Sequence, residues 1–279
     1  KYIVIMYLAG KYWQNLSSKF EYLSMDAFYD KGIVAISKIN LIQISNELGI
    51  PKETIRRKIN ELEKSNILTR EGKTIIFNKN GIDFQKPIDT IDSLSIFIEK
   101  NSKVLSAYKW FGNHLSREEI KEFIKKYFTI VWLRYFKLQI PFLLRNRKIF
   151  GDLETWIVWG NIALSAQQKY SYEQEKKIFK DNLKRESYLS ALTNAKFKHG
   201  VNASSISDIS NIPRATAIRK LKWLLKQNVI SRNKSLEYQL KKTGTLYKTI
   251  NENLVLNNNL VAEFLTDIFD YIKNSNFKL

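Results

Sequence analysis

Basic side chains recur at helical spacing in the segment that follows Pro51. Arg56 and Arg57 fall in the first turns of a predicted helix, and a guanidinium group can donate two hydrogen bonds to the edge of a guanine. Lys52 and Asn60 fall on the same outer surface. Such a face could contact the bases and phosphates of duplex DNA. The alternative is a solvated basic face on a domain that binds protein.

Two short helices and a tight turn are predicted to position these side chains. Ile44 and Leu48 lie one turn apart, and Gly49 can adopt the left-handed conformation that ends a helix. Pro51 suits the start of the next helix, because its missing N–H would be unpaired there anyway. The predicted helices span 41–48 and 51–65, and the inward stripe of the second is formed by Ile55, Ile59 and Leu62. This pattern predicts a helix-turn-helix, whose second helix fits a DNA major groove.

A hairpin is predicted after the two helices. Residues 66–70 enter a strand, 71–73 form a tight turn, and 74–77 are rich in β-branched and aromatic residues. Helix, helix and hairpin make the winged form of the motif. Arg70 and Lys73 fall near the hairpin tip, where basic groups can meet phosphates or a minor groove. An ordinary polar hairpin tip is the alternative.

The same pattern recurs 162 positions later without a gap. The matching pairs are Ile44 and Ile206, Ser45 and Ser207, Ile50 and Ile212, Pro51 and Pro213, Thr54 and Thr216, Arg57 and Arg219, Lys58 and Lys220, Lys64 and Lys226, Asn66 and Asn228, and Arg70 and Arg232. Chance could supply matching apolar residues, but it would rarely also supply the polar ones in register. We therefore expect one structural unit to be used twice.

The second copy predicts helices at 203–210 and 213–227, strands at 229–232 and 236–240, and a turn at 233–235. Its candidate DNA contacts are Arg214, Thr216, Arg219, Lys220 and Lys222 on the second helix, with Arg232 and Lys234 on the hairpin. We expect the two threonines, Thr54 and Thr216, to bind phosphate or to cap locally rather than to read bases.

The second copy differs from the first on the outer face of its second helix. Ile218 replaces Arg56 and Ala215 replaces Glu53, so this copy is expected to rely more on phosphate contact and DNA shape. Ala215 could touch a thymine methyl group. Trp223 is expected to pack in a core rather than to stack on a base.

The composition favours an anionic partner. The chain has 279 residues, of which 44% are hydrophobic, and a net charge of +19. This length suggests two or three domains, and this charge suits nucleic acid, a membrane surface or an acidic protein. A nucleotide bias that enriches Lys, Asn and Ile is an alternative explanation for part of the excess. However, residues 196–248 alone hold twelve basic and two acidic residues, around the second copy.

The residues that could support catalysis or metal binding are sparse. There is no cysteine, which excludes disulfides and thiolate metal sites and fits a reducing cytoplasm. His114 and His199 lie far apart in the sequence. The sequence lacks a phosphate-cradling loop, a nucleophile elbow and a paired-carboxylate signature. We expect a protein that is not an enzyme and that uses no metal or cofactor.

The middle of the chain is predicted to be helical and aromatic. A helix is expected from Asp92-Ser93 to about Phe111, and Ser116 to Glu119 reads as a capping box that opens a long helix, which Pro141 ends or kinks. Gly151-Asp152 starts another helix, and 172–192 reads as a charged amphipathic one. The aromatic residues are Tyr108, Trp110, Phe111, Trp132, Tyr135, Phe136, Trp156 and Trp159. A core or a dimer interface is favoured for them over a ligand pocket.

These elements give a mainly α (α+β) fold, with two winged helix-turn-helix domains joined by an aromatic-rich helical middle region. The expected division is 1–90 for N-terminal helices plus the first winged unit, 91–192 for a helical linker or dimerisation region, 193–250 for the second winged unit and 251–279 for a C-terminal helix, read at 254–272. Residues 1–40 are expected to be helical, with 32–36 before or within the first helix of the winged unit.

The chain shows no convincing export or membrane segment. It begins at Lys1 rather than Met, so the natural N-terminus could be missing, and no cleavage site follows the short apolar stretch 2–9. The apolar segment 127–144 is interrupted by Arg134, Lys137 and Pro141 and makes a poor membrane span. We expect a cytoplasmic, nucleoid-associated protein without a membrane partner.

The segment 50–68, with Pro51, Thr54, Arg56 and Arg57 followed by an apolar entry into the wing, resembles bacterial winged helix-turn-helix transcription regulators. The resemblance covers about 33–81 and, more loosely, 200–244. It implies operator binding, with Lys52, Thr54, Arg56 and Arg57 as the contacts. Asn66 stands where such regulators often have glycine, and asparagine tolerates the same left-handed geometry.

Our leading hypothesis is a sequence-specific regulator that binds double-stranded DNA through two tandem winged units, with a possible homodimer through the helical middle. The alternative is a plasmid- or phage-type replication initiator that binds repeated origin sites. A third class is a module that binds RNA or belongs to a polymerase.

Overall fold

The computed structural model describes residues 2–19, 22–31, 34–36, 40–78, 86–107, 114–178 and 200–275. These residues are mostly helical, with two small antiparallel sheets, which agrees with the expected mainly α class. The chain divides into two compact units. Unit 1 comprises Lys1–Phe142 and Asn258–Leu279, and unit 2 comprises Leu143–Asn257.

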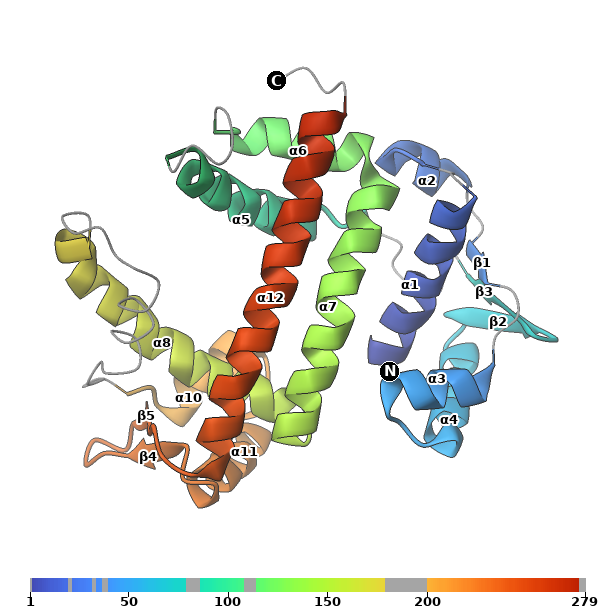
Figure 1. Cartoon of the computed structure of the whole chain (residues 1–279). Helices are drawn as coiled ribbons and strands as arrows, with labels where there is room; N and C mark the ends of the chain where they lie inside the picture. Colours follow the sequence, from blue (N-terminus) through green and yellow to red (C-terminus); the bar gives the residue numbers. More distant parts are fainter. Residues whose placement is uncertain are drawn as a thin grey trace. The chain divides into compact units, whose positions relative to one another are not determined.

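The elements of unit 1 are α1 (Tyr2–Ser18), α2 (Met25–Lys31), β1 (Val34–Ile36), α3 (Leu41–Leu48), α4 (Lys52–Lys64), β2 (Leu68–Glu71), β3 (Thr74–Phe77), α5 (Ile88–Ala107), α6 (Arg117–Lys126), the start of α7 (Phe128–Phe150) and the end of α12 (Thr245–Asn274), all labelled in Figure 1. Helices α7 and α12 contribute residues to both units. The four-part division expected from the sequence stays a prediction.

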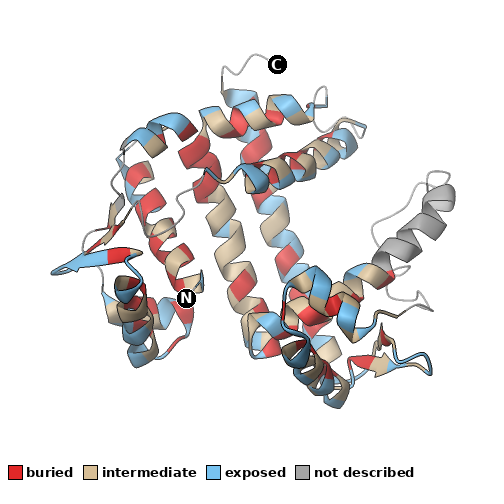
Figure 2. Ribbon diagram, turned by 180° about the vertical axis from the view of Figure 1, so that it is seen from behind, coloured by how far each residue is buried: buried red, intermediate tan, exposed pale blue. Residues whose placement is uncertain are grey.

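The first helix-turn-helix packs on α1. The apolar stripe of α4 is fully buried at Ile55, Ile59 and Leu62, as its spacing predicted. Helix α1 contacts both β1 and α4, and its buried residues include Val4 and Leu8. Buried positions are coloured red in Figure 2. This burial fixes α4 from one side and leaves its opposite face outside.

A three-stranded antiparallel sheet follows α4 in the order β1-β3-β2. The turn between β2 and β3 holds Gly72 at φ 61°, which confirms the predicted hairpin. The expectation of helix through 1–40 is wrong at Val34–Ile36, which form β1, pair with β3 and lie before the first helix of the winged unit. Their β-branched side chains suit a strand, and the partner strand lies about forty residues further on, beyond the reach of a local pattern.

The predicted boundaries of the middle helices change in three places. Helix α5 begins at Ile88, so Asp92 lies inside the helix rather than capping it. The capping box at Ser116 and Glu119 is confirmed, but a break at Tyr127 separates α6 from α7. Pro141 lies inside α7, which continues to Phe150 rather than ending there.

Asp92 faces the start of α6 instead of capping a helix. Arg117 donates a hydrogen bond to its carboxylate, and Lys121 Nζ lies 2.8 Å from its Oδ1. The hydrogen bond from Lys121 lowers the pKa of the Asp92 carboxyl most strongly, with Arg117 adding to it against the effect of burial. Side chains from two helices therefore fix α6 against α5.

The described aromatic residues of the middle region belong to both units. In unit 1, Phe128 stacks on Trp132 at 4.7 Å between ring centroids and lies 5.5 Å from Phe28. In unit 2, Trp156 and Trp159 pack against that unit's own core. The expected core role is supported for these tryptophans, while the predicted positions Tyr108, Trp110 and Phe111 lie outside the described residues.

The elements of unit 2 are the end of α7, α8 (Leu153–Ile178), α10 (Ala203–Ser210), α11 (Arg214–Lys226), β4 (Ile230–Arg232), β5 (Tyr238–Leu240) and the start of α12. The α10 and α11 helices match their predicted positions. The predicted strand from Leu236 is too long, because Leu236 has φ 63° and lies in the turn. Helix α12 begins at Thr245, nine residues before the predicted start.

The core of unit 2 gathers apolar residues from α8, α10, α11 and the hairpin. Val158, Ile206, Leu221 and Leu224 are fully or almost fully buried in this core. The predicted helix at 172–192 is present as the end of α8 up to Ile178, and 179–192 lie outside the described residues. Helices α10 and α11 therefore have a core of their own, as α3 and α4 have in unit 1.

Candidate nucleic-acid interface

The turn between α3 and α4 is built by local hydrogen bonds. Asn40 caps α3 by accepting a hydrogen bond from the Ile42 N–H at 2.9 Å, and Gly49 ends the helix at φ 59°. Ser45 Oγ donates to the carbonyl of Ile50 at 2.6 Å, which fixes the residue before Pro51. These bonds set the direction in which α4 leaves the turn.

The outer face of α4 carries cations that are partly paired within the helix. Arg56 Nε lies 2.5 Å from Glu53 Oε1, with 61% and 67% of the two side chains exposed. Arg57 Nε lies 3.9 Å from Glu61 Oε1. Lys52 is exposed and has no ion pair with any described residue, and Thr54 is half-buried. The predicted base-reading residues thus lie on one accessible face, but both arginines have acidic neighbours.

Arg70 connects the hairpin to α4 rather than extending outward. Its Nη2 donates to Glu63 Oε2 at 2.5 Å and to Asn60 Oδ1 at 2.9 Å. The hydrogen bond to Glu63 raises the pKa of the Arg70 guanidinium, against the effect of burial. Asn60 and Arg70 were predicted DNA contacts, and each already has a partner within the protein. DNA contact by these two side chains stays a prediction, whereas Lys73 is exposed in the turn of the hairpin.

The turn between α10 and α11 repeats these bonds 162 positions later. Asn202 caps α10 by accepting from the Ser205 N–H at 2.9 Å, as Asn40 caps α3. Asn211 takes the left-handed place of Gly49, at φ 53°. Ser207 Oγ donates to the carbonyl of Ile212 at 2.7 Å, and Asn228 repeats the positive φ of Asn66. The two segments therefore share side-chain bonds as well as helix positions.

The outer face of α11 has no acidic residue. The positions of Glu53, Glu61 and Glu63 in α4 are taken by Ala215, Trp223 and Leu225 in α11. Trp223 and Leu225 pack against the unit 2 core, which agrees with the expected packing role of Trp223. The exposed cations of α11 are Arg214, Arg219, Lys222 and Lys226, and none has an ion pair with a described residue. Thr216 is half-buried.

Lys220, a predicted DNA contact, already has acidic partners within the protein, so DNA contact by this side chain stays a prediction. Its Nζ lies 2.5 Å from Asp152 Oδ2 and 3.5 Å from Glu154 Oε2, and only 12% of the side chain is exposed. Burial alone would raise the pKa of Asp152, but hydrogen bonds from Lys220 and Thr155 lower it. Lys220 therefore fixes α11 to the start of α8. No local pattern indicates this pairing, apart from the acidic helix start at Asp152.

The hairpin of unit 2 carries the remaining candidates. Arg232 is exposed and lies over the ring of Tyr238, with its guanidinium carbon 5.4 Å from the ring centroid. Lys234 is exposed in the turn, which Asn233 fixes by accepting a hydrogen bond from the Glu237 N–H at 2.9 Å. Both cations can reach an external anion without losing a carboxylate partner.

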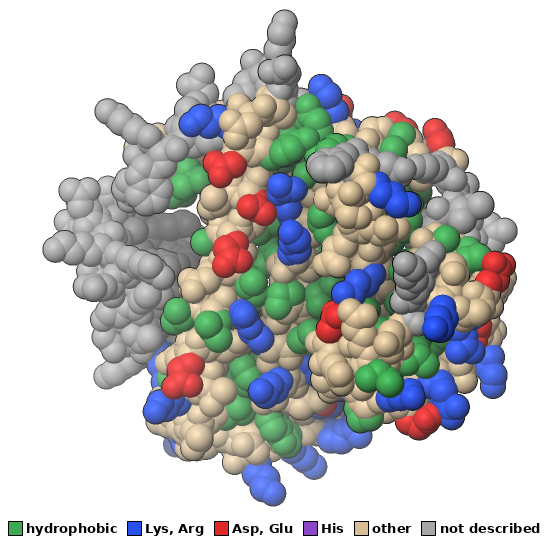
Figure 3. Space-filling view, turned by 45° about the vertical axis from the view of Figure 1, so that its right-hand side comes forward, with side chains coloured by type: hydrophobic (Ala, Val, Ile, Leu, Met, Phe, Trp, Pro, Cys, Tyr) green, Lys and Arg blue, Asp and Glu red, His purple; other side chains and the backbone are tan. Residues whose placement is uncertain are grey.

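The two recognition-type helices therefore differ in how their charge is compensated. Cations on α4 alternate with acids, whereas those on α11 face only apolar or neutral neighbours within their helix. On the face drawn in Figure 3, Lys and Arg side chains lie beside Asp and Glu in several places. Unpaired cations can bind phosphate without first breaking an internal pair.

Two observations concern metal binding and membrane insertion in the described part of the chain. Its His, Asp and Glu residues form no group of three or more that could hold a metal ion. Among the same residues, no helix has the length and apolar character needed to span a bilayer.

Comparison with known proteins identifies one domain. Residues 34–79, which run from β1 to the end of the hairpin, match the profile of the DeoR-like helix-turn-helix domain. No curated protein and no solved structure matched the chain. The chain therefore carries a DeoR-like helix-turn-helix, DNA-binding domain at residues 34–79, which supports a DNA-binding transcription regulator.

Proposed function

We propose that this protein is a sequence-specific transcriptional regulator that binds double-stranded DNA through two winged helix-turn-helix units, α3–β3 and α10–β5. The DeoR-like domain match supports the first unit. The observation that carries the proposal for the second is the repeated turn, with Ser45 and Ser207 making the same bond to the residue before a proline. Two linked units raise affinity through effective concentration.

The proposed roles of the two units differ. Arg56 and Arg57 in unit 1 read base edges, where a bidentate guanidinium contact discriminates by about 1–3 kcal/mol. Arg219 and Lys222 in unit 2 contact phosphates and supply affinity that depends little on sequence. Lys73 contributes backbone contact from the first hairpin.

Selection from random duplexes tests the proposal. We expect the full chain to enrich a sequence with two separated half-sites. Arg57→Ala should weaken binding to the selected sequence by about tenfold and relax preference at one or two base pairs. Lys73→Ala should weaken all duplexes alike. Equal losses for Arg57→Ala on selected and unrelated duplexes would contradict base reading by Arg57, and a single half-site would contradict the tandem arrangement.

The replication-initiator alternative is favoured by the same tandem arrangement. Footprinting on the source DNA separates the two: inverted sites near promoters support a regulator, and arrays of direct repeats support an initiator. A module for RNA or a polymerase would show a shallow dependence of duplex affinity on salt, whereas each phosphate contact contributes a slope of about −0.9.

We further propose that the protein acts by binding rather than by catalysis, in the cytoplasm where its DNA lies. Homodimerisation through the helical middle also stays a prediction. Sedimentation of the full chain over a range of concentrations measures it, and a constant monomer mass would refute it.

A further inference from the structure

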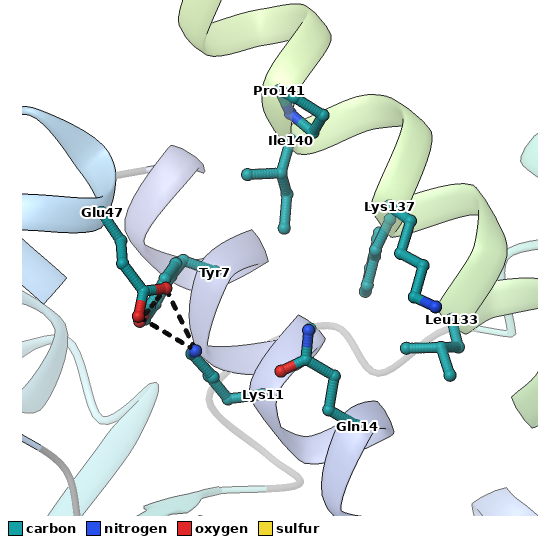
Figure 4. Close-up of a pocket in the computed structure, with 10 residues that line it drawn as sticks. Tyr7, Lys11, Gln14, Glu47, Leu133, Lys137, Ile140 and Pro141 are labelled. Carbon is teal, nitrogen blue, oxygen red and sulfur yellow. Dashed lines mark hydrogen bonds and ion pairs between the residues drawn. The ribbon is translucent and has the colours of Figure 1, made fainter. Parts of the chain in front are cut away.

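A cavity in unit 1 lies between α1, α3 and α7. Its volume is about 160 Å³. An apolar cavity of about 150 Å³ in another protein accommodates benzene, so this one has room for a ligand of similar size. Figure 4 shows side chains from all three helices around it, with Glu47 of α3 on the side opposite Lys137 of α7.

The wall contributed by α7 is largely apolar. Leu133, Phe136 and Ile140 line it. Gly10 of α1 lies opposite, and a Cβ there would stand only 3.2 Å from Ile140 Cδ1. Pro141 has no N–H, so it donates no helical hydrogen bond to the carbonyl oxygen of Lys137. The α7 side thus offers an aromatic and aliphatic surface suited to a flat apolar group.

The opposite end is polar and held in a fixed arrangement. Glu47 accepts hydrogen bonds from the Tyr7 hydroxyl at 2.7 Å and from Gln43 at 2.7 Å, and Lys11 Nζ lies 3.1 Å from it. Burial, with the bond to Glu47, raises the pKa of the Tyr7 hydroxyl, so this group remains a donor at neutral pH. Dashed lines in Figure 4 mark the contacts of Tyr7 and Lys11 with Glu47.

The charges around the cavity leave an excess of one cation. Lys11 and Lys137 are basic, and Glu47 is the acidic residue that lines the cavity with them. Glu47 already pairs with Lys11, whereas Lys137 is exposed and has no ion pair with a described residue. Gln14 also lines the cavity and adds an amide group to it. A ligand carboxylate that meets both Lys137 and Lys11 would balance the excess charge.

We propose that this cavity binds a small aromatic carboxylate and that its occupancy lowers the affinity of the first winged unit for DNA. The apolar body lies against α7, and the carboxylate meets Lys137 and the ammonium group of Lys11. The second part of the proposal rests on the proposed function, whereas the first part does not.

We expect ligand binding in the cavity to affect DNA binding through α3. Glu47 ties α3 to α1 through Tyr7 and Lys11, and Ser45 of the same helix fixes the turn before α4. A ligand carboxylate competes with Glu47 for Lys11 and so weakens the tie that holds α3. Since coupling between two sites is reciprocal, DNA should weaken ligand binding by the same factor.

Equilibrium dialysis of the full chain with radiolabelled benzoate tests the binding site without DNA. We expect saturable binding at about one site per chain, with benzamide and acetate each binding about tenfold more weakly because they lack the charge or the apolar body. Lys137→Met should reduce benzoate affinity about tenfold. Gln14→Trp, which fills the cavity from an exposed position, should abolish binding.

Lys100→Met, at an exposed lysine of α5 without an ion pair to a described residue, is the matched control and should leave benzoate affinity unchanged. Equal loss in both lysine variants, or benzamide binding as tightly as benzoate, would overturn the site. Saturating benzoate should weaken duplex binding at least threefold in the wild type and not in Lys137→Met. Benzoate binding without any change in duplex affinity would overturn the coupling, and failure to bind duplex without benzoate would instead refute the proposed function.

Discussion

We expect Glu53 to restrain the DNA affinity of α4, and replacing it tests how ion pairing affects the two units. The second unit has Ala215 at this position, so Glu53→Ala makes α4 resemble α11. The change removes the 2.5 Å ion pair with Arg56 and one negative charge from the face predicted to meet DNA. We expect the variant to bind duplex DNA more tightly than the wild type.

The expected gain can be worked from the exposure of the pair. An ion pair with both side chains about two-thirds exposed is worth about 0.3–0.5 kcal/mol, and DNA binding no longer has to break it. A carboxylate about 8 Å from a phosphate costs about 0.5 kcal/mol in water before screening by salt. Together these effects amount to about 1 kcal/mol, or about a fivefold lower Kd.

The same substitution should lower the stability of the fold while it raises DNA affinity. Glu53 lies in the first turn of α4, where Pro51 provides no side-chain cap, so the carboxylate interacts favourably with the helix dipole. Losing it should reduce the free energy of unfolding by about 0.5 kcal/mol. A variant that binds DNA more tightly while unfolding more easily separates the electrostatic effect from any general gain in stability.

Fluorescence anisotropy with a labelled duplex, from about 50 to 200 mM salt, measures the Kd and its salt slope. The slope should become steeper by up to about one unit, because α4 then presents one more uncompensated cation to the DNA. Glu122→Ala is the control, because Glu122 forms a similar exposed pair with Lys125 on α6, at 2.8 Å. An unchanged or weaker affinity in Glu53→Ala, with the fold intact, would refute the reasoning. So would an equal gain in the control.

Three further predictions concern stability. Leu221→Ala should lower the free energy of unfolding by about 2–5 kcal/mol in denaturant titrations, because Leu221 is fully buried. The neighbouring change Lys222→Ala should alter it by less than about 0.5 kcal/mol, and similar losses in the two variants would contradict the assigned core. Gly49→Ala should cost about 1 kcal/mol, because an alanine at φ 59° is strained, and Asn211→Gly at the equivalent turn should cost nothing; a neutral Gly49→Ala would contradict the turn geometry. The pKa of Asp152 in the folded protein lies below its ordinary value of 3.8, so its contribution to the free energy of unfolding is present above that pH and is lost as the pH falls through the lower folded value. Acid titrations followed by circular dichroism should therefore show a weaker dependence of stability on pH below about pH 4 in Asp152→Asn. An identical profile in the variant and the wild type would contradict the pairing of Asp152.

The helix-turn-helix could be predicted because its determinants are local. Ile55 and Ile59 mark the buried face by spacing alone, and Gly49 and Pro51 mark the turn by their backbone preferences. The capping box at Ser116 was confirmed for the same reason. The 162-residue repeat allowed the elements around Pro213 to be placed with similar accuracy.

Long-range pairs could not be predicted from these patterns. Strand β1 is three residues long, and its pairing of Val34 with Phe77 joins parts of the chain with no local relation. The partner of Lys220 lies 68 positions away at Asp152, so a lysine that looked exposed by its spacing is mostly buried. Asp92 looked like a cap, but it bonds to residues of the following helix.

By itself, the sequence determined the class of fold, the position of the first recognition helix and the existence of a second segment built in the same way. Apolar spacing and turn residues act within a few positions, so they can be seen without a structure. Only the tertiary structure decided which cations stay available to a partner. Arg219 and Lys220 are adjacent in sequence, yet the first is exposed without a carboxylate partner among the described residues and the second lies against Asp152. The strength of a charge pair depends on distance in space and on burial, and neither is encoded by position along the chain.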